Sequence, residues 1–245
     1  RDPFAVVGEG VNLNRMYSVT RNRETLYGKY IFKYHPDYKD VSLYFRRDCQ
    51  FHTEGGDVLN INEKTLAVGI SQRTQAAAID VMAQNIFWNS DSKVERILAF
   101  DIPVSRAFMH LDTVFTQIDV DKFTIHPAIL RVYELTAGKN PGDVNIRLIE
   151  DTLEHVLEDA TGVDQVKLIP CGGGDPIAAS REQWNDGSNT LCVEPGKICV
   201  YARNTVTNDV LYKEGLDLLV VPSAELSRGR GGPRCMSMPF WREDL

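Results

Sequence analysis

Cysteines are few in this chain, and their arrangement argues against two kinds of site. There are five among 245 residues, an odd number at irregular spacings, and no CxxC pair occurs. Neither a disulfide framework nor a zinc site is therefore expected, and a reducing, cytoplasmic location is favoured. HExxH and EF-hand patterns are also missing, so the sequence gives no support to a metal-dependent mechanism.

Long hydrophobic runs and clustered basic residues are missing as well. No run of roughly 18 apolar residues exists, so no membrane span is predicted. Lysine and arginine are scattered and the net charge is −7, whereas a nucleic-acid-binding protein would show a basic stripe. The glycines at 172–174 lack the Lys-Ser/Thr of a phosphate-binding loop and predict a turn or close packing. What remains is ordinary globular composition, 43% hydrophobic and 25% charged.

The chain does carry an approximate repeat of strand, turn, strand, helix and strand, each copy introduced by an acidic residue. The copies begin at Asp2, Asp57, Asp112 and Asp186. Such a recurrence fits a radial array of similar ββαβ units, in which the opening acids converge on one axis. It fits equally well an ordinary α+β alternation in which aspartate is a turn residue flanking strands.

The repeat predicts most element positions. Strands are expected at 4–8, 11–16, 57–61, 65–71, 96–102, 112–118, 122–127, 166–170, 188–193, 197–202 and 216–222. Helices are expected from about Thr20 as N-cap, from Thr74, over 150–160 and from Thr205. In the second helix, Ile79, Met82, Ala83 and Ile86 share one face. The last segment is expected to end in a short orphan strand that carries Cys235.

Cys235 has the most reactive setting of the five cysteines. It follows Arg228, Arg230 and Arg234 in a loop that also holds Gly229, Gly231 and Gly232. Positive neighbours favour the nucleophilic thiolate, and glycines let the backbone approach a ligand closely. Cys235 is therefore a candidate nucleophile, with a free cysteine packed in a strand as the alternative. The other four cysteines are expected to be structural.

Several acids and one histidine are candidates for substrate binding and proton transfer. His110 and Asp112 are two residues apart, which places both on one face of a strand as an acid/base and binding pair. Glu54 and Asp57 bracket two glycines, and Asp2 and Asp186 open other copies. Several carboxylates in one pocket would suit a guanidinium, which is planar and presents five N–H donors. Taken singly, each acid also fits a turn or cap.

The motifs that hold these residues resemble the arginine deiminase family of the guanidine-modifying (pentein) superfamily. The matching stretches cover almost the whole chain, and the last three are the most specific together. They are RDPF at 1–4, LNRMY at 13–17, RNRETL at 21–26, EGGDVL at 54–59, AVGISQRT at 67–74, RAFMHLDTVF at 106–115, KFTIHP at 122–127, REQWNDGSN at 181–189 and SRGRGGPRCMSMP at 227–239.

The resemblance implies an α/β fold, a five-fold pseudosymmetric ββαβ propeller. Residues 1–245 would form a single catalytic domain with about four units and an orphan terminal strand. An amino-terminal unit and an inserted helical bundle would be missing, so the segment upstream of Arg1 would be a partner of this chain. Self-association into a homo-oligomer is left open.

The resemblance also implies a set of residue roles. Cys235 would be the nucleophile, His110 the general acid/base, and Glu54 a hydrogen-bond partner of both the substrate and His110. Asp2 and Asp112 would hold the guanidinium. Arg21, Arg73 and Arg230 would contact the substrate carboxylate or gate the site, and Gly229 would also bind the substrate. Free L-arginine would be hydrolysed to L-citrulline and ammonia through a covalent amidino-cysteine, with no cofactor.

Two alternatives remain at this point. One is another guanidine-modifying enzyme, either an amidinotransferase or a dimethylarginine hydrolase, which would share the Cys, His and acid set. The other, from a different class, is a non-catalytic fragment that binds arginine without converting it. Ammonia release from unmodified arginine discriminates against the first, and citrulline production discriminates against the second.

Overall fold

The computed structural model describes residues 1–104, 108–126, 129, 131–229 and 231–243, without the side chain of residue 227. The chain divides into two compact units. Unit 1 comprises Arg1–Val104, Leu130–Ile149 and Met238–Leu245, and unit 2 comprises Ser105–Ile129 and Glu150–Ser237. No helix in the described part of the chain is long and apolar enough to cross a membrane.

All four sheets contain the same ββαβ arrangement. Two strands form an antiparallel hairpin, a helix follows, and a third strand pairs in parallel with the second. In unit 1 these are β1 (Phe4–Val7), β2 (Gly10–Leu13), α1 (Thr25–Tyr34) and β3 (Ser42–Phe45), then β4 (Val58–Asn60), β5 (Thr65–Ile70), α2 (Ala76–Trp88) and β6 (Arg96–Asp101). In unit 2 they are β7 (Phe115–Gln117), β8 (Lys122–Ile125), α3 (Leu153–Thr161) and β11 (Lys167–Pro170), then β12 (Leu191–Glu194), β13 (Lys197–Tyr201), α5 (Thr205–Lys213) and β14 (Asp217–Val221). The predicted order of elements is confirmed in every copy.

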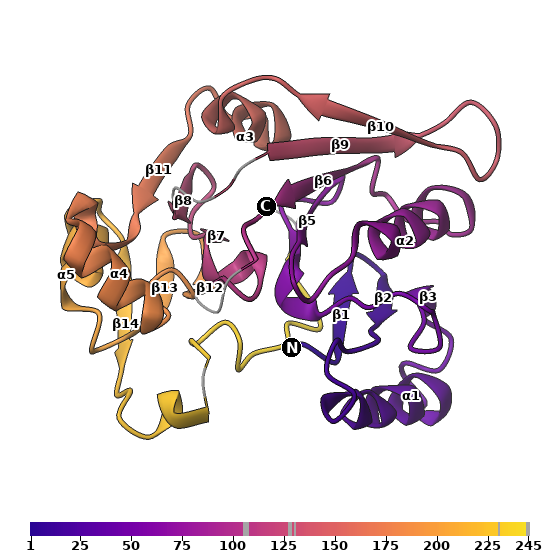
Figure 1. Cartoon of the computed structure of the whole chain (residues 1–245), viewed down its shortest axis with the longest axis horizontal. Coiled ribbons are helices and arrows are strands. Elements are labelled where there is room, and N and C mark those ends of the chain that lie inside the picture. Colours follow the sequence, from indigo (N-terminus) through magenta and orange to yellow (C-terminus); the bar gives the residue numbers. More distant parts are fainter. Residues whose placement is uncertain (105–107, 127–128, 130, 230, 244–245) are drawn as a thin grey trace. The chain divides into compact units, whose positions relative to one another are not determined.

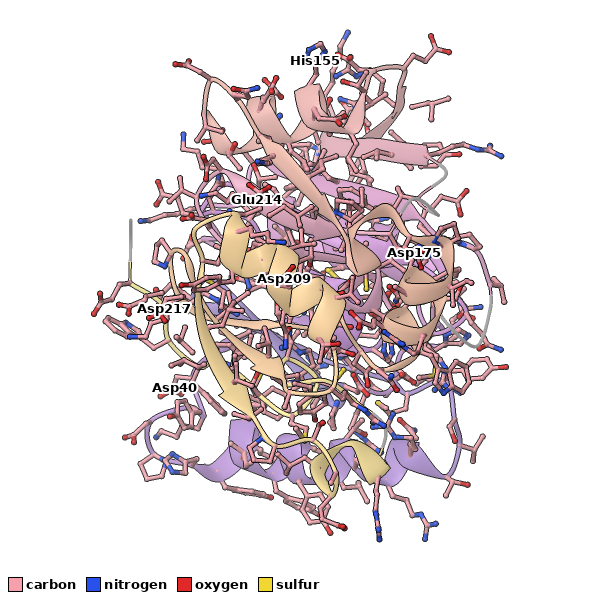
Figure 2. The ribbon with its side chains drawn as sticks, turned by 90° about the vertical axis from the view of Figure 1, so that its left-hand side faces the viewer. Asp40, His155, Asp175, Asp209, Glu214 and Asp217 are labelled. Carbon is pink, nitrogen blue, oxygen red and sulfur yellow. The ribbon has the colours of Figure 1, made fainter. Side chains whose placement is uncertain are left out.

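Two insertions interrupt this regularity. The hairpin of β9 (Arg131–Ala137) and β10 (Val144–Ile149) lies between β8 and α3 in the sequence. It adds two antiparallel strands to the β4–β5–β6 sheet of unit 1, as Figure 1 shows. The second insertion is α4 (Pro176–Trp184) in unit 2, which Asp175 caps by accepting a hydrogen bond from the Ala178 N–H (Figure 2). Neither insertion was predicted.

The core of unit 1 forms around α2. The predicted apolar face is confirmed: Ile79, Met82, Ala83 and Ile86 are buried and pack with residues of β5 and β6. Burying a large aliphatic side chain contributes about 1.5–3 kcal/mol, so this face accounts for much of the helix's stability. The expected start of the first helix was wrong by a turn. A 3-10 turn at Arg21–Arg23 follows Thr20, whose side chain makes no capping bond, and α1 begins at Thr25.

Unit 2 has a separate apolar core between α5 and its neighbouring strands. Ile118, Ile169, Ile198, Val200, Leu211 and Leu216 are buried together. The rings of Phe115 on β7 and Phe123 on β8 stack at 5.2 Å. Residues 171–174 form the tight turn that their glycines predict. This core supports the loops on which the candidate nucleophile lies.

Candidate functional site

Three of the predicted site residues, Asp2, Glu54 and His110, lie just before the first strand of a ββαβ copy. Asp2 lies in the turn before β1. Glu54 immediately precedes a 3-10 turn, Gly55–Asp57, that leads into β4. His110 likewise precedes a 3-10 turn, Leu111–Thr113, just before β7. The expectation that His110 and Asp112 share a strand face was therefore wrong. The His110 carbonyl accepts from the Thr113 N–H at 3.1 Å and from its hydroxyl at 2.6 Å, which closes the chain into a turn.

In unit 1, Asp2 accepts hydrogen bonds through its backbone carbonyl and forms an ion pair through its carboxylate. Its carbonyl accepts from the Asn14 side-chain amide at 2.8 Å and from the Gly55 N–H at 3.1 Å. Its carboxylate accepts from the Arg21 guanidinium at 3.0 Å. Arg21 also makes a bidentate pair with Glu24, two bonds of 2.9 Å. The Glu24 hydrogen bonds and, less strongly, the Asp2 charge outweigh burial and raise the pKa of Arg21, which stays charged at every pH of interest.

Glu54 is fully buried in unit 1 and is likewise paired with an arginine. One carboxylate oxygen accepts from the Tyr17 N–H at 3.0 Å, and the other lies 3.5 Å from the Arg73 guanidinium. The Arg73 guanidinium also stacks over the Tyr17 ring, 5.2 Å from its centre. A carboxylate without exposure to water needs such partners, because an isolated buried charge is costly.

Close backbone packing explains why the first residue after Glu54 in the EGGD motif, Gly55, is a glycine. A Cβ at this position would lie 2.3 Å from the Arg1 carbonyl oxygen and 2.9 Å from the Phe4 carbonyl oxygen. No larger residue fits without moving backbone. Glycine here lets the segment carrying Glu54 approach the segment carrying Asp2, so two candidate substrate-binding acids lie on adjoining backbone in unit 1.

In unit 2, Asp112 forms the most buried of the three ion pairs. Its carboxylate is fully buried and accepts from the Arg234 guanidinium at 3.1 Å, while the Arg234 side chain is 12% exposed. Arg234 directly precedes Cys235 in the chain. The ion pair therefore connects the segment of the candidate nucleophile to a candidate guanidinium-binding acid.

Cys235 lies in a tight turn, and the orphan strand predicted for it is wrong. The Met236 N–H donates to the Gly232 carbonyl at 3.3 Å, and the Ser237 N–H donates to the Arg234 carbonyl at 3.2 Å. The Cys235 N–H donates to the Asn189 side-chain oxygen at 3.0 Å, so its donor is used by a side chain and not by a sheet ladder. These short-range bonds replace a sheet ladder and hold the thiol on a compact turn.

Tyr201 on β13 supports the same turn. Its hydroxyl donates to the Gly231 carbonyl at 2.8 Å, four residues before the candidate nucleophile. Burial, together with electrostatic interactions with Asp186 and Cys235, raises the pKa of Tyr201. The phenol therefore stays protonated at neutral pH and remains a hydrogen-bond donor to the turn.

Other residues singled out in the sequence have different outcomes. Asp57 accepts a bond of 2.7 Å from the Ser71 hydroxyl and braces the turn after β5. Asp186 adopts a positive φ of 61°, which is typical of an aspartate in a turn. No atom lies within 4 Å of a Cβ built on Gly229, so packing does not require glycine there. Arg230 lies outside the described residues.

Four residues of these arrangements were not singled out for the roles they take. Asn14 holds the Asp2 backbone, Arg234 pairs with Asp112, Asn189 binds the Cys235 N–H, and Tyr201 supports the turn. For Asn189, the available signal was the NDGSN stretch at 185–189. An asparagine without exposure to water must bond both ends of its amide.

The fold is similar to that of known guanidine-converting enzymes. An apo crystal structure of an arginine dihydrolase from cyanobacteria superimposes with a TM-score of 0.69 at 19% identity, covering 100% of this chain and 32% of that chain. A dimethylarginine dimethylaminohydrolase adduct has a TM-score of 0.57 at 16% identity, covering 98% and 76%. At these identities the likeness defines the mixed α/β fold with several sheets.

The sequence comparison is more specific. The arginine deiminase family model matches residues 1–242. The chain is 61% identical to an arginine deiminase of Treponema denticola and 56% identical to one of Clostridium perfringens, over 100% of its own length in each case. It spans 61% and 60% of those relatives. The chain belongs to the arginine deiminase family.

Proposed function

We propose that this chain carries the catalytic residues of an enzyme that hydrolyses free L-arginine to L-citrulline and ammonia. The observation that carries the proposal is that each of three acids, Asp2, Glu54 and Asp112, already binds an arginine guanidinium from its own unit. A carboxylate placed to accept guanidinium N–H groups is the partner that the reacting end of arginine requires. Family membership supports the same substrate.

In the proposed first step, the Cys235 thiolate attacks the guanidinium carbon of arginine. Asp2 and Asp112 hold the guanidinium nitrogens, and Glu54 accepts a further N–H. The carbon becomes tetrahedral and the thiolate electron pair neutralises the guanidinium, so positive charge localises on nitrogen only when the leaving nitrogen is protonated, where carboxylates stabilise it. His110 gives a proton to one terminal nitrogen, the C–N bond breaks, and ammonia leaves. The product is an amidino group bonded to Cys235 sulfur.

In the second step, His110 removes a proton from water, which adds to the amidino carbon. The C–S bond then breaks, Cys235 leaves as thiolate, the hydroxyl proton passes to solvent, and the carbonyl of citrulline forms. One water is consumed and one ammonia released, so the atoms balance without an oxidant, a reductant or a cofactor. Division of a difficult displacement into two easier ones is the advantage of a covalent nucleophile.

Specificity for free arginine is assigned to Arg21 and Arg73, which would bind the substrate carboxylate; Arg230 and Gly229 are assigned to the same end of the substrate or to gating. We also propose that the four ββαβ copies belong to a five-fold pseudosymmetric propeller forming a single catalytic domain. The ββαβ arrangement shared by the four sheets of the described residues, one of which carries two additional strands, supports this. The five free thiols support a reducing, cytoplasmic location.

The proposal is tested with protein expressed from its complete gene. Arginine, agmatine and dimethylarginine are supplied separately, and citrulline and ammonia are both measured. The proposal predicts equal amounts of citrulline and ammonia from arginine. Conversion of dimethylarginine alone would identify a dimethylarginine hydrolase instead. Arginine binding by calorimetry without citrulline formation would identify a non-catalytic binding protein.

A further inference from the structure

One buried amide side chain in unit 2 spans two proposed catalytic residues. The Asn189 side-chain oxygen accepts the Cys235 backbone N–H at 3.0 Å, and its side-chain nitrogen donates to the Asp112 backbone carbonyl at 3.0 Å. Asn189 has no exposure to water. A single planar group therefore fixes the separation between the backbone of the proposed nucleophile and that of a proposed guanidinium-binding acid.

The chemistry of the two partners determines the orientation of this amide. A backbone N–H can donate only, and a carbonyl can accept only. Rotating the Asn189 amide by half a turn would place its NH₂ against the Cys235 N–H and its oxygen against the Asp112 carbonyl. Both bonds would be lost inside a buried region, where an unsatisfied polar group costs about 1–3 kcal/mol. One orientation is therefore strongly favoured.

The backbone of Asn189 is also in close contact with the turn that carries Cys235. A Cβ built on Gly232 would lie 2.5 Å from both the carbonyl and the side-chain oxygen of Asn189. The Asn189 N–H donates to the Asp186 carbonyl at 3.1 Å, which anchors its own loop. Gly232 thus leaves room for the Asn189 side chain, and the Asn189 amide in turn binds the turn at Cys235.

We propose that Asn189 is a positioning residue, which sets the place of the Cys235 sulfur relative to Asp112 by bonding the backbone of both. The inference deepens the proposed function and depends on it for its kinetic test. Because the Cys235 N–H is already bonded to Asn189, that N–H is not a donor to the substrate. Asn189 acts through the nucleophile's place in the site and does not touch the reacting atoms.

The first test is Asn189→Ala in protein expressed from its complete gene, with steady-state kinetics on arginine. A misplacement of about 1 Å between reacting groups costs roughly 100-fold in rate, so kcat should fall by about that factor. KM should change by less than about fivefold, because the proposed guanidinium-binding carboxylates remain. The matched control is Asn208→Ala, which removes an amide bonded to the Tyr201 carbonyl at 2.9 Å in the same unit. Equal losses of kcat in both variants, or a loss confined to KM, would overturn the inference.

The second test is Asn189→Asp, which preserves size and is informative even if the alanine variant does not fold. When protonated, the introduced carboxyl can still accept from the Cys235 N–H and donate to the Asp112 carbonyl. When ionised, it has no proton to donate and repels that carbonyl. The ratio of variant kcat to unmodified kcat should therefore fall about tenfold or more as the pH rises from about 5 to about 8. A ratio independent of pH would contradict the positioning role.

A third readout separates this inference from the proposed function. Alkylation of Cys235 by iodoacetamide, followed by peptide mass spectrometry, reports thiol reactivity without turnover. If the unmodified protein forms no citrulline, the proposed function fails. The positioning role then still predicts that Asn189→Asp lowers the Cys235 alkylation rate increasingly with pH, relative to the unmodified protein. An unchanged relative rate would overturn it independently.

Discussion

Each unit contains an ion pair between an arginine and a proposed substrate-binding aspartate, and the two pairs differ in their exposure to water. In unit 1, Arg21 is 38% exposed and its partner Asp2 is 16% exposed. In unit 2, Arg234 is 12% exposed and its partner Asp112 is fully buried. Exposed ion pairs contribute about 0–1 kcal/mol, whereas removal of one partner from a buried pair costs about 3–5 kcal/mol.

This difference suggests different roles for the two arginines. Arg21 shares its donors between Asp2 and Glu24, so it can release Asp2 to an incoming guanidinium and still keep a bidentate partner. Arg234 has no comparable exposure and lies next to Cys235 in the sequence. We infer that Arg21 belongs to the exchangeable part of the site and Arg234 to its permanent support.

Removal of the nucleophile should have the largest effect. Cys235→Ser should lower kcat for arginine by roughly 10⁴-fold or more, since a serine hydroxyl is not ionised near neutral pH. Arginine affinity, measured by calorimetry, should change by less than about threefold because the acids remain. Cys199→Ser on β13 is the matched control and should keep its activity. Substantial turnover in Cys235→Ser would remove Cys235 from its role.

Breaking the ion pair of unit 2 should cost more unfolding free energy than breaking that of unit 1. Arg234→Ala should lower the free energy of unfolding by about 3–5 kcal/mol, because it leaves the buried Asp112 carboxylate without its guanidinium. Arg21→Ala should lower it by only about 0–1 kcal/mol. Urea unfolding of both variants measures the difference. Equal losses would show that the contrast in exposure has no energetic consequence.

Removal of the substrate's carboxylate tests the assignment of the unit 1 arginines. Agmatine lacks this group, so charge-assisted hydrogen bonds to Arg21 and Arg73 cannot form. Each is worth about 1.5–3 kcal/mol, so the loss of both predicts a kcat/KM for agmatine lower than that for arginine by roughly 100- to 10,000-fold. In Arg73→Ala this preference should shrink. Comparable kcat/KM values for both substrates with the unmodified protein would contradict the assignment.

The smallest effect concerns a second buried carboxylate of unit 2. Burial tends to raise the pKa of Glu182, but hydrogen bonds from the Thr207 hydroxyl and from the Thr207 and Val206 N–H groups outweigh it and lower the pKa below 4.5. A lowered pKa in the folded state stabilises the protein above pH 4.5, and this contribution is lost as the pH falls through the folded-state value.

Glu182→Gln should therefore cost about 1–2 kcal/mol at neutral pH and less in acid. Chemical denaturation at a series of pH values measures this. A cost that did not shrink toward low pH would show that the Glu182 charge contributes nothing at the start of α5.

Local patterns predicted the repeating elements well. The four ββαβ copies and the buried face of α2 follow from apolar periodicity and turn residues, which depend on neighbours close in sequence. The β9–β10 hairpin did not follow, because it interrupts a copy and joins a sheet formed by distant strands. The Cys235 segment was expected to be a strand, yet its N–H is bonded to Asn189, 46 residues away.

The candidate site residues were selected by type, and the sequence indicated little of their geometry. Asp2, Glu54 and Asp112 were expected to bind a guanidinium, and each accepts one in the structure, although from an arginine of the chain itself. The pairing of Arg234 with Asp112 joins residues 122 apart in sequence, and no local pattern encodes such a partner. The roles of all the proposed site residues stay predictions.

The central claim is that Cys235 forms a covalent bond to the guanidinium carbon of arginine. The most direct measurement is peptide mass spectrometry of protein that is acid-quenched during turnover of isotopically labelled arginine. The account predicts a labelled, arginine-derived amidino adduct on the peptide containing Cys235, absent in Cys235→Ser and absent after the substrate is exhausted. A labelled adduct on any of the other four cysteines, with the Cys235 peptide unmodified, would contradict it.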